Sequence, residues 1–162
     1  MLEDLETYIS AQKTIAHYMM GFGVIMVLLA IFLHFTGTNT VFNGLKIGLL
    51  VVGLLSAGGG YGYRITEDKL LSKQSELYEQ DQKKFQVAEH ERMQKVLGKH
   101  PYILIGMSAV IAILLILIFF VKNNLIQGIL FSVIIYLLGN LIIETISKNS
   151  IQLYFDQLSK FQ

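Results

Sequence analysis

The chain alternates between long apolar runs and stretches rich in charged residues. Four apolar runs stand out, at residues 18–35, 45–63, 101–121 and 125–143. Each is close to the ~20 helical residues that are needed to cross a hydrocarbon core of roughly 30 Å. The pattern therefore predicts an all-α integral membrane protein with four transmembrane helices.

Short polar stretches join the apolar runs in pairs. Residues 36–44 contain Gly, Thr and Asn, and the dipeptide Asn43-Gly44 is typical of a turn. Residues 121–125 leave room only for a very short turn. We therefore expect two membrane hairpins, separated by the long charged segment 64–100.

The charged segment itself is predicted to be helical. It has no Gly or Pro between Thr66 and Leu97 and is rich in good helix formers. Thr66 is a candidate N-cap, and Pro101 is expected at the start of the third span. One straight helix of this length would reach about 50 Å. We therefore expect a bend within residues 79–84, giving a helical hairpin that projects into water; the alternative is a segment that lies along the membrane surface.

Apolar residues recur at helical spacing in the charged segment and also at both ends of the chain. Leu2, Leu5, Ile9 and Gln12 share one face, and residues 145–162 return to an amphipathic pattern. The sequence thus predicts amphipathic helices outside the membrane. Their apolar faces must be covered, either by one another or by another protein.

The basic residues are distributed unevenly between the two sides of the predicted membrane domain. Of 13 Lys and Arg, only Lys46 and Lys122 lie outside the termini and the central segment. The positive-inside rule predicts a multi-pass cell-membrane protein with both termini and residues 64–100 in the cytoplasm. The acidic start, residues 1–6, does not have the pattern of a signal peptide, so we expect no processing.

Composition excludes several classes of function. The net charge of +1, with dispersed basic residues, gives no indication of nucleic-acid binding. The chain has no cysteine, which excludes disulfides, thiolate metal sites and thiol nucleophiles. No sequence motif for a catalytic site, a metal or a cofactor is present, so we expect none of the three.

The two halves of the chain carry similar motifs. Ser72-Lys73-Gln74-Ser75 precedes Leu77-Tyr78 and Lys84-Phe85-Gln86, while Ser147-Lys148-Asn149-Ser150 precedes Leu153-Tyr154 and Lys160-Phe161-Gln162. This favours a duplication, with a first repeat at 1–86 and a second at 87–162. Each repeat holds two spans, so the copies would be parallel and related by a pseudo-two-fold axis along the membrane normal. The alternative is chance similarity between helical segments of similar composition.

Small residues are concentrated in the second span, with a further pair in the fourth. Such residues let helix backbones approach closely. The alternatives are packing within the chain, self-association, or a partly unwound end at residues 58–62. The candidate packing or pore positions are Gly44, Gly48, Gly53, Ser56, Gly60, Gly128 and Ser132.

Four polar residues near the membrane boundary are the candidate polar site. His17 and His100 occupy matching positions before the first and third spans and are expected to be interfacial anchors, or else a functional pair. Asn140 is expected to bond across helices. Glu144 has Lys148 four residues on as a favourable partner, and its alternative role is contact with an ion or a partner.

These features favour association over chemistry. We expect a non-enzymatic interaction, scaffold or accessory subunit that acts through its cytoplasmic helices on copies of itself or on a membrane or cytoplasmic protein. An immunity-type factor is one version of this class. The alternative is a small homo-oligomeric channel or transporter with the glycine-rich second span at the pore. The third class, an enzyme acting on lipid, would require His17, His100 or Glu144 to be indispensable.

Overall fold

Long helices make up nearly the whole of the described chain. The computed structural model describes residues 1–37 and 39–160, and over these it contains helix and no strand. The helices are α1 (Leu2–Thr36), α2 (Thr40–Gln80), α3 (Gln82–Phe120) and α4 (Asn124–Ser159). The all-α prediction is confirmed.

Each helix is much longer than a membrane crossing requires. The helices contain 35, 41, 39 and 36 residues, and at ~1.5 Å per residue each reaches more than 50 Å. All four hold a stretch that is long and apolar enough to cross a membrane, which confirms the prediction of four candidate spans. The remainder of each helix extends beyond its apolar stretch.

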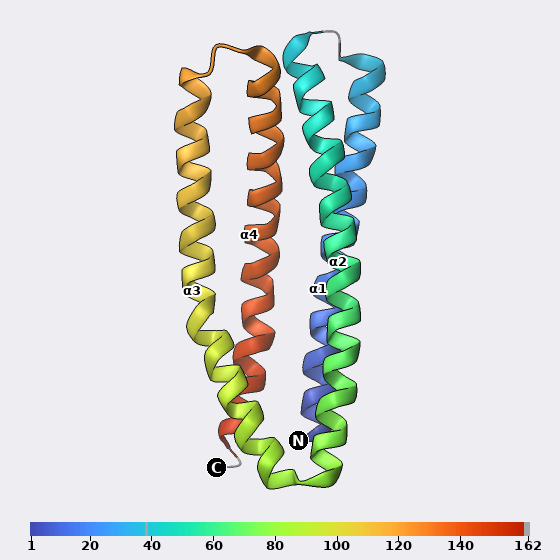
Figure 1. The fold of residues 1–162 in the computed structure, drawn as a ribbon, viewed down its shortest axis with the longest axis vertical. Helices are drawn as coiled ribbons and strands as arrows, with labels where there is room; N and C mark the ends of the chain where they lie inside the picture. The colour runs from blue at the N-terminus through green and yellow to red at the C-terminus, as the bar shows by residue number, and fades with distance from the viewer. Residues whose placement is uncertain (38, 161–162) are drawn as a thin grey trace.

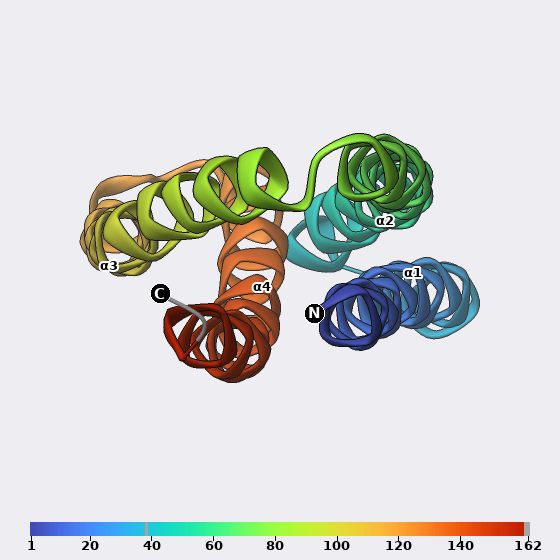
Figure 2. The same cartoon turned by 90° about the horizontal axis from the view of Figure 1, so that it is seen from below.

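The extensions gather at one end of the molecule, together with the start of α1, the end of α4 and the α2–α3 turn (Figure 1). We call this the charged end; it comprises residues 1–17, 64–100 and 144–160. The α1–α2 and α3–α4 connections lie at the opposite end. Seen along the long axis, α4 lies between α3 and the α1–α2 pair (Figure 2).

The predicted bend in the central segment is confirmed. Asp81 has extended backbone, φ −158° and ψ 98°, between the end of α2 and the start of α3. Its carboxylate accepts a hydrogen bond from the backbone N–H of Lys84 at 3.0 Å and so caps α3. The two arms run along the long axis of the molecule (Figure 1).

The expected helix boundaries at Thr66 and Pro101 are wrong. The hydroxyl of Thr66 donates to the carbonyl of Gly62 at 3.0 Å within a continuous α2. Pro101 lies inside α3, although a proline there removes one helical hydrogen bond and favours a kink. Figure 1 shows α3 bending in this region. The charged-end segments are therefore continuations of the spans rather than separate helices.

Residues 58–62 also belong to the continuous α2, so the alternative of a partly unwound end is wrong. A glycine costs a helix about 1 kcal/mol relative to alanine. That cost is tolerable inside a helix that is nucleated on both sides. A cluster of glycines thus lowers local helix preference without ending the helix.

The apolar faces of the charged end pack against one another. This charged-end core joins α1, α3 and α4, and α2 contributes partly buried side chains from Leu70, Leu71, Leu77 and Tyr78. These faces are therefore covered by other segments of the same chain. The buried members are Leu5, Tyr8, Ile9, Phe85, Met93, Ile151, Tyr154 and Leu158.

The internal repeat stays a prediction from the sequence. Both proposed repeats hold one hairpin, but the apolar stretch of α3 is almost unburied while that of α2 is one-third buried. The end of the second motif, Phe161 and Gln162, lies outside the described residues.

Candidate functional site at the junction of the four helices

Small residues set how closely the helices approach. A Cβ added to Gly44 would collide with the backbone of Leu125, and one added to Gly128 would collide with the backbone of Val41 and Leu45. One added to Gly48 would collide with the side chain of Ser132. These candidate positions therefore lie at one contact, between α2 and α4.

The remaining small residues lie where α2 contacts α1. A Cβ on Gly53 would lie 2.9 Å from the carbonyl oxygen of Gly23, and one on Gly60 would lie 2.7 Å from that of Ala16. The hydroxyl of Ser56 donates to the carbonyl of Met19 at 3.0 Å. These candidate positions are thus covered by helices of the same chain.

A cavity of about 480 Å³ lies where the spans meet the charged end. We call it the junction cavity. All four helices contribute to its wall, through a set of polar residues and a set of mainly apolar ones. The polar set is Tyr63, His100, Asn140, Glu144 and Ser147. The other set is Ile15, Met19, Gly59, Val96, Ile103, Ile143 and Ile151.

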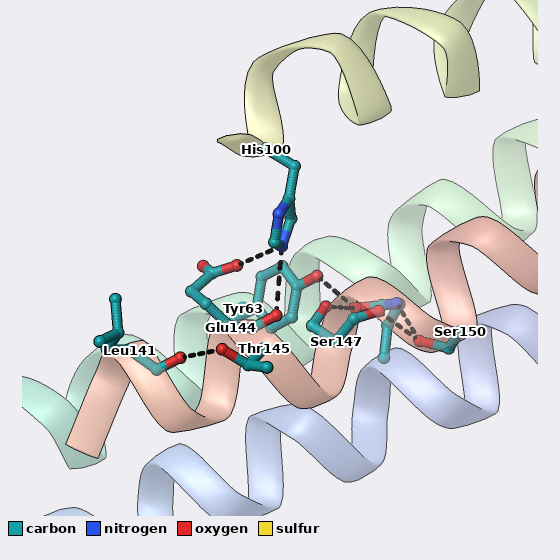
Figure 3. Close-up of polar contacts among 8 residues, drawn as sticks. Tyr63, His100, Leu141, Glu144, Thr145, Ser147 and Ser150 are labelled. Carbon is teal, nitrogen blue, oxygen red and sulfur yellow. Dashed lines mark hydrogen bonds and ion pairs between the residues drawn. The ribbon is translucent and has the colours of Figure 1, made fainter. Parts of the chain in front are cut away.

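His100 joins α3 to α4 across this cavity. Its side chain is only 3% exposed, and its Nε2 lies 3.1 Å from the carbonyl oxygen of Glu144 and 3.5 Å from the Glu144 carboxylate (Figure 3). A carbonyl oxygen only accepts, so Nε2 carries the proton and donates. The other ring nitrogen, Nδ1, is buried and has no partner among the described residues.

Two sequence expectations for this site are wrong. Over residues 1–37 and 39–160, Asn140 makes no bond across helices; its amide Nδ2 donates to the carbonyl of Tyr136 at 2.8 Å within α4. Among the described residues, the carboxylate of Glu144 contacts Nε2 of His100 rather than the amine of Lys148. A neighbouring helix supplies the better-placed partner, and sequence spacing along α4 could not indicate it.

His17 and His100 are not brought together. His17 is exposed, and its Nδ1 donates to the carbonyl of Lys13 at 2.7 Å, one turn earlier in α1. It lines a separate, mostly apolar groove between α1 and α4, with Tyr18 and Phe22. The candidate polar site therefore reduces to His100, Asn140 and Glu144.

Gln12 is a residue of this site that the sequence analysis missed. It is fully buried; its Oε1 accepts from the Tyr63 hydroxyl at 2.9 Å and from the Ser147 hydroxyl at 3.1 Å. Its Nε2 donates to the hydroxyl of Ser150 at 3.0 Å. Gln12 thus ties α1 to α2 and α4. A glutamine on the same face as Leu5 and Ile9 was the available signal.

A buried charged group lies deeper in the charged end, within the charged-end core. Glu89 is fully buried and receives two hydrogen bonds from Arg92, at 2.8 and 2.6 Å. Burial alone would lower the pKa of Arg92, but the hydrogen bond and the charge of Glu89 outweigh it and raise that pKa. Burial raises the pKa of Tyr8 to about 12. Arg92 therefore stays charged inside the core.

Glu67 is a second buried carboxyl at this end. It is 5% exposed, and its Oε2 has no hydrogen-bond partner among the described residues. Burial raises the pKa of this carboxyl because the charged form loses water. Glu67 is therefore a group through which stability depends on pH.

The junction cavity has the properties of a binding site. Its volume is within the range of about 300–1,000 Å³ that is common for small-molecule sites, and its apolar wall carries a few polar groups. Among residues 1–37 and 39–160, no group of three or more His, Asp or Glu is placed to hold a metal ion. Comparison with models of protein families, with curated proteins and with solved structures gives no match for this chain.

Proposed function

We propose that this chain is a non-enzymatic, multi-pass membrane protein that acts as an interaction or accessory subunit through its charged end. The observation that carries the proposal is the closed packing of four helix extensions around the charged-end core. Such packing holds a folded module at a fixed distance from the membrane. Its outward surface is available to a second protein or to another copy of the chain.

The surface near the α2–α3 turn supports a polar mode of association. Exposed residues of both charges surround this turn; they are Lys69, Lys73, Glu76, Glu79, Lys83 and Lys84. Charged surfaces of this kind favour fast, specific encounter more than high affinity. The apolar faces, by contrast, are occupied within the chain.

We further propose that the charged end is cytoplasmic. Of the 13 Lys and Arg in the chain, Lys46 and Lys122 alone lie away from the charged end. Basic residues that flank membrane spans are retained on the cytoplasmic side. This bias supports a partner that is either cytoplasmic or in the same membrane.

The glycine-lined channel gains no support from the packing. Gly44, Gly48, Gly53 and Gly60 lie against other helices of the same chain. A pore formed by the second spans of several copies would need these faces to be free. An interaction through the charged end does not require these faces to be free.

Native mass spectrometry in lipid nanodiscs prepared from the host membrane tests the proposal. We expect a complex with a companion, either a second protein or another copy, that is lost in the charge-reversal variant K83E/K84E. The matched control, Lys122→Glu, changes a lysine at the opposite end and should keep the companion. A lone monomer, or a companion that all variants retain equally, would argue against an interaction through the charged end.

A further inference from the structure

The junction cavity offers hydrogen-bond acceptors in excess of donors. The hydroxyls of Tyr63 and Ser147 both donate to Gln12. One amide hydrogen of Asn140 is donated to the carbonyl of Tyr136 within α4, and the Nε2–H of His100 is donated to the carbonyl of Glu144. Lone pairs of these groups, together with the Glu144 carboxylate, are what the wall presents to a ligand.

The cavity wall also carries a negative charge without a Lys or Arg side chain to balance it. Of the twelve lining residues, Glu144 is the acidic one and none is Lys or Arg. In the neutral imidazole of His100, Nε2–H donates to the Glu144 carbonyl, and the buried Nδ1 is an acceptor that has no partner within the part of the chain that the structure describes. A carboxylate at a partly buried site is stabilised by a cation that also donates hydrogen bonds.

From this arrangement we infer that the junction cavity binds an amphiphile with a protonated amine head. The ammonium group would donate to the Glu144 carboxylate and to neighbouring acceptors such as the side-chain carbonyl of Asn140. The Tyr63 ring, which also lines the cavity, offers a face of the kind that attracts cations. This inference is independent of the proposed interaction role, because the cavity and the surface near Lys83 use different residues.

The rest of the wall suits an alkyl chain. Ile103 follows His100 along α3 and Ile143 precedes Glu144 along α4, in each case toward the apolar stretch, and Met19 lies within the apolar stretch of α1. An apolar tail placed against them buries CH₂ groups at about 0.8 kcal/mol each. The ammonium could belong to a lipid headgroup or to a free alkylamine, and the two share the chemistry that the cavity recognises.

Calorimetric titration of the purified protein in maltoside micelles provides the first test. We expect saturable, one-site binding of octylamine, and at least tenfold weaker binding of octanol and octanoate, which have chains of the same length without an ammonium group. Equal binding of octylamine and octanol would overturn the inference, since the cavity would then recognise only the chain. Absence of saturable octylamine binding would also overturn it.

Two matched pairs of variants place the ligand in the cavity. Glu144→Gln should weaken octylamine binding at least tenfold, whereas Asp156→Asn, which removes an exposed carboxylate from the same helix, should not. Gly59 lines the cavity and Gly58 does not, although a Cβ at either position meets open space. Gly59→Leu should therefore block binding and Gly58→Leu should leave it unchanged. Wild-type affinity in both Glu144→Gln and Gly59→Leu would overturn the assignment.

Native mass spectrometry then identifies the source of the ammonium. Wild-type protein is released from phosphatidylglycerol nanodiscs that contain a minor fraction of phosphatidylethanolamine. Selective retention of phosphatidylethanolamine by wild type, and its loss in Gly59→Leu, assigns the site to a lipid headgroup. Octylamine binding without such retention assigns it to a free amine. Preferential retention of phosphatidylglycerol through Glu144 would contradict the ammonium chemistry.

Discussion

The ring of Tyr8 on α1 stacks on that of Tyr154 on α4, with centroids 4.6 Å apart and planes 11° from parallel. The two residues lie close to opposite ends of the chain. The guanidinium of Arg92 lies 5.6 Å from the centre of the Tyr8 ring, so α3 joins the same contact. This cluster holds the charged end together around a buried charge.

Arg92→Met is expected to destabilise the protein by about 3–5 kcal/mol, because it leaves the buried carboxylate of Glu89 without its partner. The double variant E89L/R92M removes both charges and should recover most of that loss. Thermal unfolding of the purified protein, followed by circular dichroism, measures both effects. Lys95→Met on the exposed face of α3 is the control and should remain within about 0.5 kcal/mol of wild type. A double variant as unstable as the single one would show that the charge is not the cause.

Glu67→Gln is expected to stabilise the protein at neutral pH. Burial raises the folded-state pKa of Glu67 above its ordinary value of 4.5, so the folded state holds this proton more tightly than the unfolded state does. The contribution of Glu67 to stability is therefore full below pH 4.5 and falls as pH rises through the folded-state pKa. The advantage of Glu67→Gln over wild type should appear above that pH and vanish below it.

Unfolding measured as a function of pH tests this expectation, with Glu79→Gln as the control because Glu79 is an exposed carboxyl of the same helix. Only the difference from wild type is compared, so the other titrating groups cancel. A pH-independent difference for Glu67→Gln would mean that the Glu67 carboxyl is not perturbed by burial.

Gly128→Ala is expected to lower stability by about 1–3 kcal/mol, because the new methyl group meets the backbone of α2 and the helices must separate. Gly106→Ala makes the same change where a Cβ meets open space. It should be neutral or slightly stabilising, since alanine favours the helix by about 1 kcal/mol. Equal melting temperatures for the two variants, measured in the same detergent, would contradict the close contact between α2 and α4.

The sidedness of the charged end can be measured without background, since the natural chain has no cysteine. Gln82→Cys and Asn124→Cys place one thiol at each end of the bundle. With a membrane-impermeant maleimide, we expect Asn124→Cys to react in intact cells and Gln82→Cys to react only after the membrane is permeabilised. The reverse pattern would place the charged end outside the cell.

Local sequence information accounts for much of this architecture. Apolar runs of suitable length are expensive to expose to water, so the four candidate spans could be placed from hydropathy alone. The bend at Asp81 was expected because residues 79–84 are polar and the chain must reverse there. The predicted helix boundaries at Thr66 and Pro101 were wrong. A cap residue or a proline changes the stability of a helix only locally, which is not enough to end it. Long helices with favourable packing on both sides override such changes.

The candidate site was predicted only in part. Glu144 and His100 were identified as polar residues near a membrane boundary, but their contact joins residues 44 positions apart. Gln12 was placed on the correct face without being recognised as the centre of a network. Burial among three helices is what makes its hydrogen bonds matter.

The sequence by itself determined the helical class, the number of apolar stretches and the end of the molecule where charge gathers, because these depend on composition and spacing along the chain. The tertiary structure decided that the apolar faces of the charged end cover one another, that the glycines of α2 are occupied within the chain, and that His100 meets Glu144. Those outcomes depend on how four helices are rotated and spaced, which is fixed by contacts between distant residues.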